Sequence, residues 1–176
     1  NGGYRVAPYF IERVEDAKGN VLMAARPAAA GMGAERAIDA RNAFIMTSIM
    51  RDVVRTGTGA RVMKLGRSDL AGKTGTTNEF VDAWFCGFTS ELVAVAWIGF
   101  DAPHTLGRNE TGAQAALPMW MGYMGTVLDG VPEQPLVRPD GVVALHVNPD
   151  TGLRIADAQA GVADYFYQEF PPPAQE

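Results

Sequence analysis

The residues best suited to chemistry lie in one short stretch, 72–80, which reads Gly-Lys-Thr-Gly-Thr-Thr-Asn-Glu-Phe. It holds one cation, three hydroxyl groups and two glycines. The pattern indicates an exposed strand, on which side chains alternate, so Lys73 and Gly75 would share one face and Thr74 and Thr76 the other. Backbone donors would lie between them along the strand edge. These groups predict a site for a peptide that ends in a carboxylate.

The same residues also match the end of a phosphate-binding loop, G-x-x-x-x-G-K-[ST]. That loop requires a glycine at position 67, but Arg67 stands there and Gly66 is one residue too far upstream. The residues after Lys73 are poor helix formers and lead into a β-rich run from Val81, whereas a helix should follow the loop. The spacing therefore argues against a nucleotide site.

Composition narrows the class of protein. The chain has 176 residues, 47% of them hydrophobic and 20% charged, with a formal charge of −5, as in an ordinary globular protein. Without a cluster of lysines or arginines, nucleic acid is not an expected partner. The lone Cys86 lies in an apolar run and is expected to be buried and inert. Two isolated histidines and one cysteine lack metal-ligand spacing, so we expect no metal and no cofactor.

Neither an anchor nor a targeting signal is visible in the sequence. The longest apolar run, Leu92 to Phe100, is only as long as a strand, and the opening Asn1-Gly2-Gly3-Tyr4 has no targeting pattern. The first residue is not methionine. We interpret the sequence as a piece of a longer chain whose anchor and further catalytic groups would lie upstream.

Two helices are predicted. The first begins at Asp39, a plausible N-cap, and ends at Thr56-Gly57-Thr58-Gly59. Its expected buried positions are Phe44, Ile45, Ile49 and Val53. The second lies between about residues 113 and 128, with Pro118 in its first turn or at a kink.

Three strands are predicted in close succession, at 70–76, 81–89 and 92–100. Short connections favour an antiparallel meander. The second and third strands are apolar on both faces, so both faces need a cover. The expected fold is α+β, with an antiparallel sheet covered by helices on both faces.

Two hairpins should flank this body. The first would pair Tyr4–Ile11 with Val21–Met23 around a turn at 16–20, although Pro8 would place its first strand at an edge or break it. A group of prolines then marks a change in sequence composition. We therefore divide the chain into a body, 1–130, and an extension, 131–176. The extension would hold a second hairpin, Val142–Val147 with Leu153–Ala156 around Asn148–Gly152, and a loosely docked proline-rich tail.

No nucleophile with an activating base is evident. His104 and His146 lie outside any nucleophile motif and are expected at the surface. The nearest approach to S-x-x-K is Ser48 with Arg51, but arginine stays protonated and cannot act as a base. Ser48 is expected to be packed or bonded back to its helix. Glu79, Asp82 and Asp101 are at least as compatible with structural roles at strand ends as with catalysis.

Lys73-Thr74-Gly75 is also the K-T-G element of penicillin-binding proteins and β-lactamases. Its context extends the match through Arg55-Thr-Gly-Thr-Gly-Ala60, Asp82-Ala-Trp-Phe85 and Trp97-Ile-Gly-Phe-Asp101. Together these residues closely resemble the C-terminal half of the transpeptidase domain of class A, bifunctional penicillin-binding proteins, most like the 1A type. The expected fold is therefore β-lactamase/transpeptidase-like and incomplete in this chain.

The resemblance implies a role for each residue of the strand. Lys73 would hold a hydroxyl network and attract the substrate carboxylate, and Thr74, Thr76 and Thr77 would belong to the substrate-binding set. The backbone N–H of Thr76 would be one of two oxyanion-hole donors. Gly75 would keep the strand bare for substrate.

The implied reaction is acyl transfer from a D-alanyl-D-alanine stem peptide to a serine, then to an amine of a neighbouring peptidoglycan strand. β-Lactam antibiotics would acylate the same serine. The implied location is the periplasmic face of the cytoplasmic membrane.

This chain departs from the family pattern in what it lacks. S-x-x-K, the serine-x-asparagine motif and the glycosyltransferase domain with its membrane anchor are all absent. We therefore expect the chain alone to be inactive and to need the missing N-terminal part of the same protein as its partner. Two alternatives stay open: a serine β-lactamase or D,D-carboxypeptidase fragment, and a non-catalytic peptide-binding module.

Overall fold

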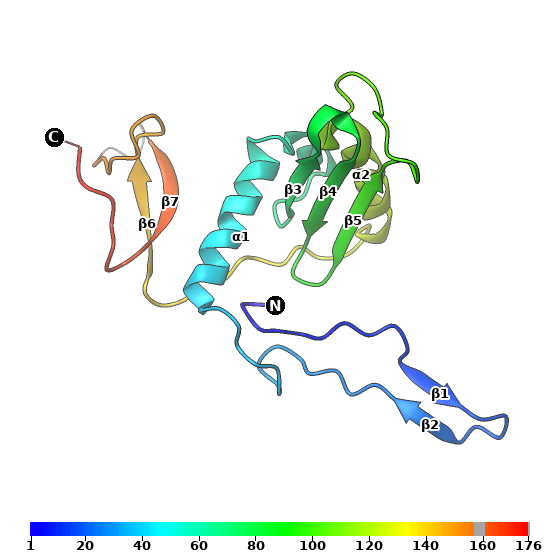
Figure 1. The fold of residues 1–176 in the computed structure, drawn as a ribbon. Helices are drawn as coiled ribbons and strands as arrows, with labels where there is room; N and C mark the ends of the chain where they lie inside the picture. Colours follow the sequence, from blue (N-terminus) through cyan, green and yellow to red (C-terminus); the bar gives the residue numbers. More distant parts are fainter. Residues whose placement is uncertain (157–160, 176) are drawn as a thin grey trace.

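The computed structural model describes residues 1–156 and 161–175. Figure 1 shows three parts: an extended N-terminal arm, a central body of helices and a sheet, and a C-terminal hairpin. The arm carries β1 (Arg13–Glu15) and β2 (Val21–Ala24), and the hairpin consists of β6 (Val142–Val147) and β7 (Val162–Tyr167). The body contains α1 (Ala40–Arg55), η1 (Ala60–Leu65), β3 (Ala71–Thr76), η2 (Asn78–Phe80), β4 (Ala83–Phe88), β5 (Val93–Ile98), η3 (Gly112–Ala116) and α2 (Leu117–Val127).

The central sheet has the order β3-β4-β5, and both pairings are antiparallel. Thr74 pairs with Phe85, and Phe85 with Ala96, so alternate residues of all three strands share one face. The connections are short, as the sequence indicated. The predicted meander is confirmed, with strands slightly shorter than expected.

The first helix matches its predicted bounds, and its predicted face is confirmed at Phe44, half-buried at Ile45 and Val53, and wrong at Ile49. The carboxylate of Asp39 accepts a hydrogen bond from the Arg41 N–H and so caps α1, which ends at Arg55. Phe44, Ser48 and Val54 are buried, whereas Ile49 is 47% exposed. The prediction for Ile49 was wrong because the apolar positions formed two overlapping helical stripes and packing selected the other one.

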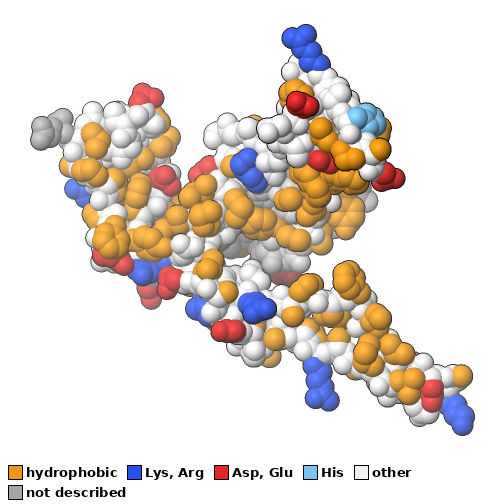
Figure 2. Space-filling view, in the orientation of Figure 1, with side chains coloured by type: hydrophobic (Ala, Val, Ile, Leu, Met, Phe, Trp, Pro, Cys, Tyr) orange, Lys and Arg blue, Asp and Glu red, His pale blue; other side chains and the backbone are white. Residues whose placement is uncertain are grey.

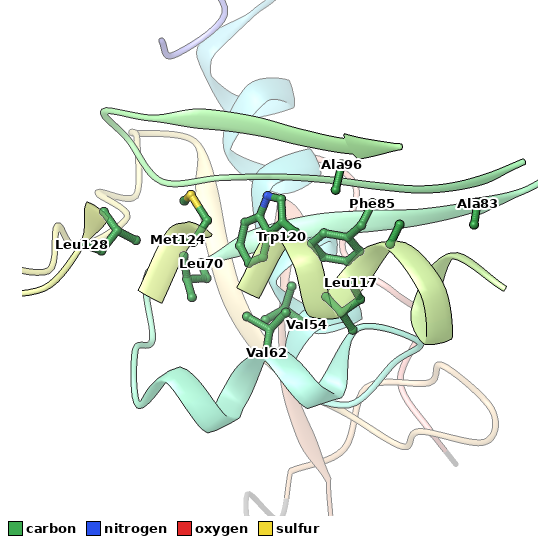
Figure 3. Close-up of a cluster of buried hydrophobic side chains, with 11 residues drawn as sticks. Val54, Val62, Leu70, Ala83, Phe85, Ala96, Leu117, Trp120, Met124 and Leu128 are labelled. Atoms are coloured by element: carbon green, nitrogen blue, oxygen red, sulfur yellow. The ribbon is translucent and has the colours of Figure 1, made fainter. Parts of the chain in front are cut away.

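One face of the sheet carries the hydrophobic core. Phe85 of β4 packs edge-on against Trp120 of α2, with ring centroids 4.9 Å apart, and Val54 of α1 belongs to the same cluster (Figure 3). The Trp120 indole donates a hydrogen bond of 3.0 Å to the Ala94 carbonyl. Pro118 lies in the first turn of α2, directly after η3, so the first-turn alternative of the prediction is confirmed. Residues of both helices therefore pack against this face of the sheet.

The opposite face of the sheet is open in the part of the chain that the structure describes. Trp84 and Val95 are 39% and 56% exposed, and Cys86 is exposed as well. The α+β class with an antiparallel sheet is confirmed, but the second helical cover and the buried thiol are not present here. Apolar residues on both sides of a strand indicate that both faces of the sheet need to be covered. They do not indicate that the covering segment belongs to this chain.

The N-terminal arm forms a shorter hairpin than predicted. Its turn is the expected one, since Asp16 accepts hydrogen bonds from the N–H groups of Lys18 and Asn20 at 2.8 and 2.9 Å. The first strand is β1, however, and Tyr4 makes only a single bridge to Arg36. Pro8 has no N–H and restricts its predecessor, which accounts for the loss of the predicted Tyr4–Ile11 strand. All residues of β1 and β2 are exposed, and Figure 2 shows hydrophobic side chains along the arm.

The C-terminal hairpin has a different second strand from the one expected. β6 pairs antiparallel with β7. Leu153–Ala156 forms no strand, but it meets the end of β6 through a bridge from Arg154 to Val147 and a hydrogen bond of 2.9 Å from the Ile155 N–H to the His146 carbonyl. The hairpin rests on α1, where Phe44 meets Tyr165 edge-on at 4.9 Å and Arg41 pairs with Glu169 at 2.6 Å. The tail is docked through the Gln175 N–H, which donates to the Arg154 carbonyl. The division at residue 130 stays a prediction.

Candidate functional site

The K-T-G residues form β3, which lies at one edge of the sheet. The Thr77 N–H donates a hydrogen bond of 3.1 Å to the Asp82 carbonyl, directly beyond the last pair of the β3–β4 ladder. Hydrogen-bonded and non-hydrogen-bonded pairs alternate in an antiparallel ladder. The backbone N–H and C=O groups of Thr76 and Thr74 therefore point away from β4, toward the free edge.

Lys73 lies on the open face of the sheet, as its pairing with the exposed Cys86 shows. Its side chain is exposed, and its ammonium group donates a hydrogen bond of 3.0 Å to the Thr74 carbonyl. Because this carbonyl points to the free edge, the positive charge lies at that edge too. The predicted alternation is confirmed: Lys73 and Gly75 share one face, and Thr74 and Thr76 share the other.

The three threonine hydroxyls are held by neighbouring groups. Thr74 Oγ1 lies 2.8 Å from Thr58 Oγ1, and Thr76 Oγ1 accepts a hydrogen bond of 3.0 Å from the Gly112 N–H. Thr77 Oγ1 accepts one of 2.7 Å from the Asp82 N–H. A hydroxyl that accepts from a backbone N–H keeps its own proton for another acceptor. Thr76 can therefore still donate to an anion.

Gly112 is a site residue that sequence reasoning missed. A Cβ atom there would collide with the carbonyl oxygens of Trp84 and Gly75. Only glycine therefore lets η3 approach the backbone of β3 closely enough for the hydrogen bond to Thr76. The contact spans 36 residues of sequence, and nothing local in the sequence indicated it. Thr58 belongs to the Arg55–Ala60 motif, but the sequence pattern does not indicate its contact with Thr74.

The turn after β3 is held by hydrogen bonds to neighbouring segments. Glu79 and Phe80 have φ angles of 57° and 55°, which non-glycine residues rarely adopt, and the Phe80 carbonyl accepts from the Leu106 N–H at 2.8 Å. Asp82 Oδ1 accepts a hydrogen bond of 2.8 Å from the Trp97 indole, which supports the structural reading of this carboxylate. His104 stacks on Phe100 at 3.8 Å and is exposed.

Within residues 1–156 and 161–175, no serine stands beside the K-T-G strand with a base. Ser48 is 5% exposed inside α1, and Ser68 donates a hydrogen bond of 2.6 Å to Glu133. Ser90 lies in the β4–β5 turn, at the far end of the sheet from Thr76. The described residues therefore place the K-T-G groups at the outer edge of the sheet without a serine and base beside them.

The described residues contain no group of three or more His, Cys, Asp or Glu side chains that could hold a metal ion. Over the same part of the chain, no helix combines the length and apolar character needed to cross a membrane.

Comparison with known proteins places the chain in a family. The family described as "Penicillin binding protein transpeptidase domain" matches residues 1–115. The chain therefore belongs to the penicillin-binding protein transpeptidases. Within that class it corresponds to part of a class A enzyme of the 1A type, which the individual relatives support.

Two relatives illustrate the match. Penicillin-binding protein 1A of Pseudomonas aeruginosa is 40% identical over 99% of this chain and 27% of its own length. The protein of the same name from Neisseria lactamica is 50% identical over 91% of this chain and 21% of its own. The crystal structure of penicillin-binding protein 1A from Haemophilus influenzae superposes with a TM-score of 0.90 at 31% identity, covering 100% of this chain and 31% of that one. This chain thus spans between about a fifth and a third of each of these proteins.

Proposed function

We propose that the chain supplies the substrate-binding wall of a peptidoglycan D,D-transpeptidase. The observation that carries the proposal is the free edge of β3, where the Thr76 N–H, the Thr74 backbone groups and the Lys73 ammonium converge. An extended peptide can add to such an edge as a further strand, with main-chain hydrogen bonds that set its orientation. The cation then selects a peptide that ends in a carboxylate.

Each residue of the edge has a chemical task in this reaction. The Thr76 N–H would donate to the oxyanion that develops when the D-alanyl carbonyl is attacked, and one fixed donor of this kind contributes about 3 kcal/mol. The Thr76 hydroxyl, held by Gly112, would donate to the terminal carboxylate. Thr74, Thr77 and Gly75 would complete the binding surface. β-Lactams, which mimic the acyl donor, would bind at the same edge.

The nucleophile would come from elsewhere in the longer polypeptide. A serine with a nearby lysine would attack the D-Ala-D-Ala peptide, release D-alanine and pass the acyl group to an amine of a second stem peptide. No cofactor is required for this sequence. The anchor that would hold the enzyme at the periplasmic face of the cytoplasmic membrane would also lie outside this chain, which on its own would be inactive.

A fluorescent penicillin tests the proposal. We expect covalent labelling of the longer polypeptide and none of the 176-residue chain alone. In the longer polypeptide, Lys73→Ala should slow acylation by about 100-fold, because a charged group at the reacting centre is lost. Lys64→Ala is the matched control, since Lys64 is exposed in η1 and should leave the rate unchanged.

Three results would contradict the proposal in different ways. Labelling of the isolated chain would show that it contains its own nucleophile. An unlabelled longer polypeptide would remove the transpeptidase assignment and leave a peptide-binding module. Equal rates for the Lys73 and Lys64 variants would remove the role of the Lys73 ammonium.

A further inference from the structure

A second polar site lies away from the K-T-G edge, in a cavity beside α1. The cavity has a volume of about 250 Å³ and is bounded by α1, by the β4–β5 turn and by the segment 134–139. Its lining is largely apolar, with Phe44, Phe88 and Leu136 among the walls. Arg51 is the one arginine or lysine in that lining among the described residues.

Arg51 enters this cavity without a partner. Its Nε is buried and has no hydrogen-bond acceptor among the described residues, and none of the ion pairs found in them includes its guanidinium. Burial lowers the pKa of Arg51, and the positive charge of Arg55 one turn further along α1 lowers it further. Arginine stays charged in proteins, so the structure keeps a half-buried cation with one buried N–H donor that has no acceptor among the described residues.

The acidic residue that lines the same cavity is already paired with another arginine. Asp69 also lines the cavity, but its two oxygens accept hydrogen bonds of 2.9 and 2.8 Å from the guanidinium of Arg67. Its Oδ2 also accepts from the Gln134 N–H at 3.2 Å. Burial acts to raise the pKa of Asp69, but these bonds hold it below its ordinary value. Asp69 therefore has its own counter-ion.

We infer that this cavity binds a carboxylate through the guanidinium of Arg51. A planar guanidinium matches a carboxylate with two parallel hydrogen bonds. One cation balances one negative charge, and the neighbouring carboxylate of Asp69 would repel the second charge of a phosphate dianion. The apolar walls would contact the carbon atoms next to the carboxylate. The Ser90 hydroxyl lines the same cavity and would be a second donor to the carboxylate, whereas the Thr47 hydroxyl already donates to the Ala43 carbonyl at 2.8 Å.

The carboxylate can come from two sources. One is an aspartate or glutamate from a part of the longer polypeptide outside this chain; the other is a free small carboxylate. Either would meet the guanidinium of Arg51 in the same way. The site is separate from the K-T-G edge, so its test does not depend on the transpeptidase proposal.

Hydrogen exchange of the α1 amides in the longer polypeptide tests the site and separates the sources. Wild type is compared with Arg51→Met, which keeps most of the side-chain length, and with Arg51→Lys, which keeps the charge but not the fork. Arg55→Met is the matched control, because Arg55 makes only a loose pair of 3.6 Å with Asp52. Each protein is measured in carboxylate-free buffer, then with sodium acetate, sodium chloride or inorganic phosphate at equal ionic strength.

If the polypeptide supplies the carboxylate, Arg51→Met should accelerate exchange by about tenfold without acetate, Arg51→Lys by less, and the control should not change. If the carboxylate is free, acetate but not chloride should slow exchange in wild type and have no effect on Arg51→Met. Protection by phosphate without protection by acetate would overturn the carboxylate assignment. Exchange that neither Arg51→Met nor acetate changes would overturn the site itself.

Discussion

The two faces of the central sheet are built by the same three strands and differ in what covers them. On one face Phe85 and Ala96 are buried in one core cluster with residues of α1, η3 and α2. On the other face Trp84, Val95 and Trp97 are 39%, 56% and 43% exposed. Both sets are apolar, so hydrophobicity alone does not tell a covered face from an open one.

The functional groups follow the same division. Lys73 is on the open face, whereas the hydroxyls of Thr74 and Thr76 are held on the covered face by Thr58 and Gly112. The covered side therefore fixes the position of the strand, and the open side presents its charge. Such an arrangement suits a binding edge, because the support does not use up the binding groups: the Thr76 hydroxyl accepts from the Gly112 N–H and keeps its own proton for another acceptor.

The largest expected effect is on the covered face. Trp120→Ala should lower the free energy of unfolding by about 3–5 kcal/mol, because a fully buried indole leaves a cavity against Phe85 and an unpaired carbonyl at Ala94. Urea unfolding of the chain measures this change as a shift in midpoint at constant slope.

Tyr123→Ala is its control, since Tyr123 lies on the same helix with 52% of its surface exposed. We expect it to cost less than about 1 kcal/mol. Equal losses for the two variants would mean that α2 does not pack on the sheet as described.

Much of this covered face could be predicted from the sequence. The Asp39 cap and the glycines after Arg55 set the bounds of α1, and the short connections set the meander, because these signals are local. The strand β7 was missed because its partner β6 lies beyond a long connection, and the nearer segment Leu153–Ala156 fitted the turn equally well. Tertiary packing, which the local sequence does not show, determines which of the two segments pairs with β6.

Gly112→Ala tests the contact that joins the covered side to the site. The added methyl group would meet backbone oxygens that cannot rotate away, and overpacking of this kind costs about 1–3 kcal/mol. It should also displace η3 from Thr76 and slow acylation of the longer polypeptide by fluorescent penicillin. Unfolding by urea and the rate of labelling are the two measurements.

Gly122→Ala provides a control of opposite sign. Gly122 lies in α2 with open space around its Cβ position, so alanine should stabilise the helix by about 0.5–1 kcal/mol and leave labelling unchanged. If both glycine variants behaved alike, the close approach of η3 to β3 would not be needed.

The site itself was only half predictable. Lys73, the threonines and Gly75 carry a local alternation that assigns each side chain to a face, and the structure confirms it. Their supports, Thr58 and Gly112, are 16 and 36 residues from their partners, so no local pattern could reveal them. The exposure of Cys86 could not be predicted either. An apolar strand pattern does not show whether the segment that covers the strand belongs to the same chain.

The smallest expected effect is on the open face. Val95→Thr keeps the shape of the side chain, and in the 176-residue chain it should change the free energy of unfolding by no more than about 0.5 kcal/mol. Its neighbour on the covered face, Ala96, is 6% exposed, so Ala96→Ser should bury a hydroxyl and cost about 1–3 kcal/mol. Urea unfolding compares the two.

The same two variants, measured in the longer polypeptide, test whether the open face of the sheet is covered there. If another part of the polypeptide packs on the open face, Val95→Thr should there approach the cost of Ala96→Ser, because its hydroxyl would also be buried. Hydrogen exchange of the β5 amides measures both variants locally. If Val95→Thr stayed neutral in both forms, this face would be exposed in the longer polypeptide too, and its apolar residues would need an explanation other than packing within the same protein.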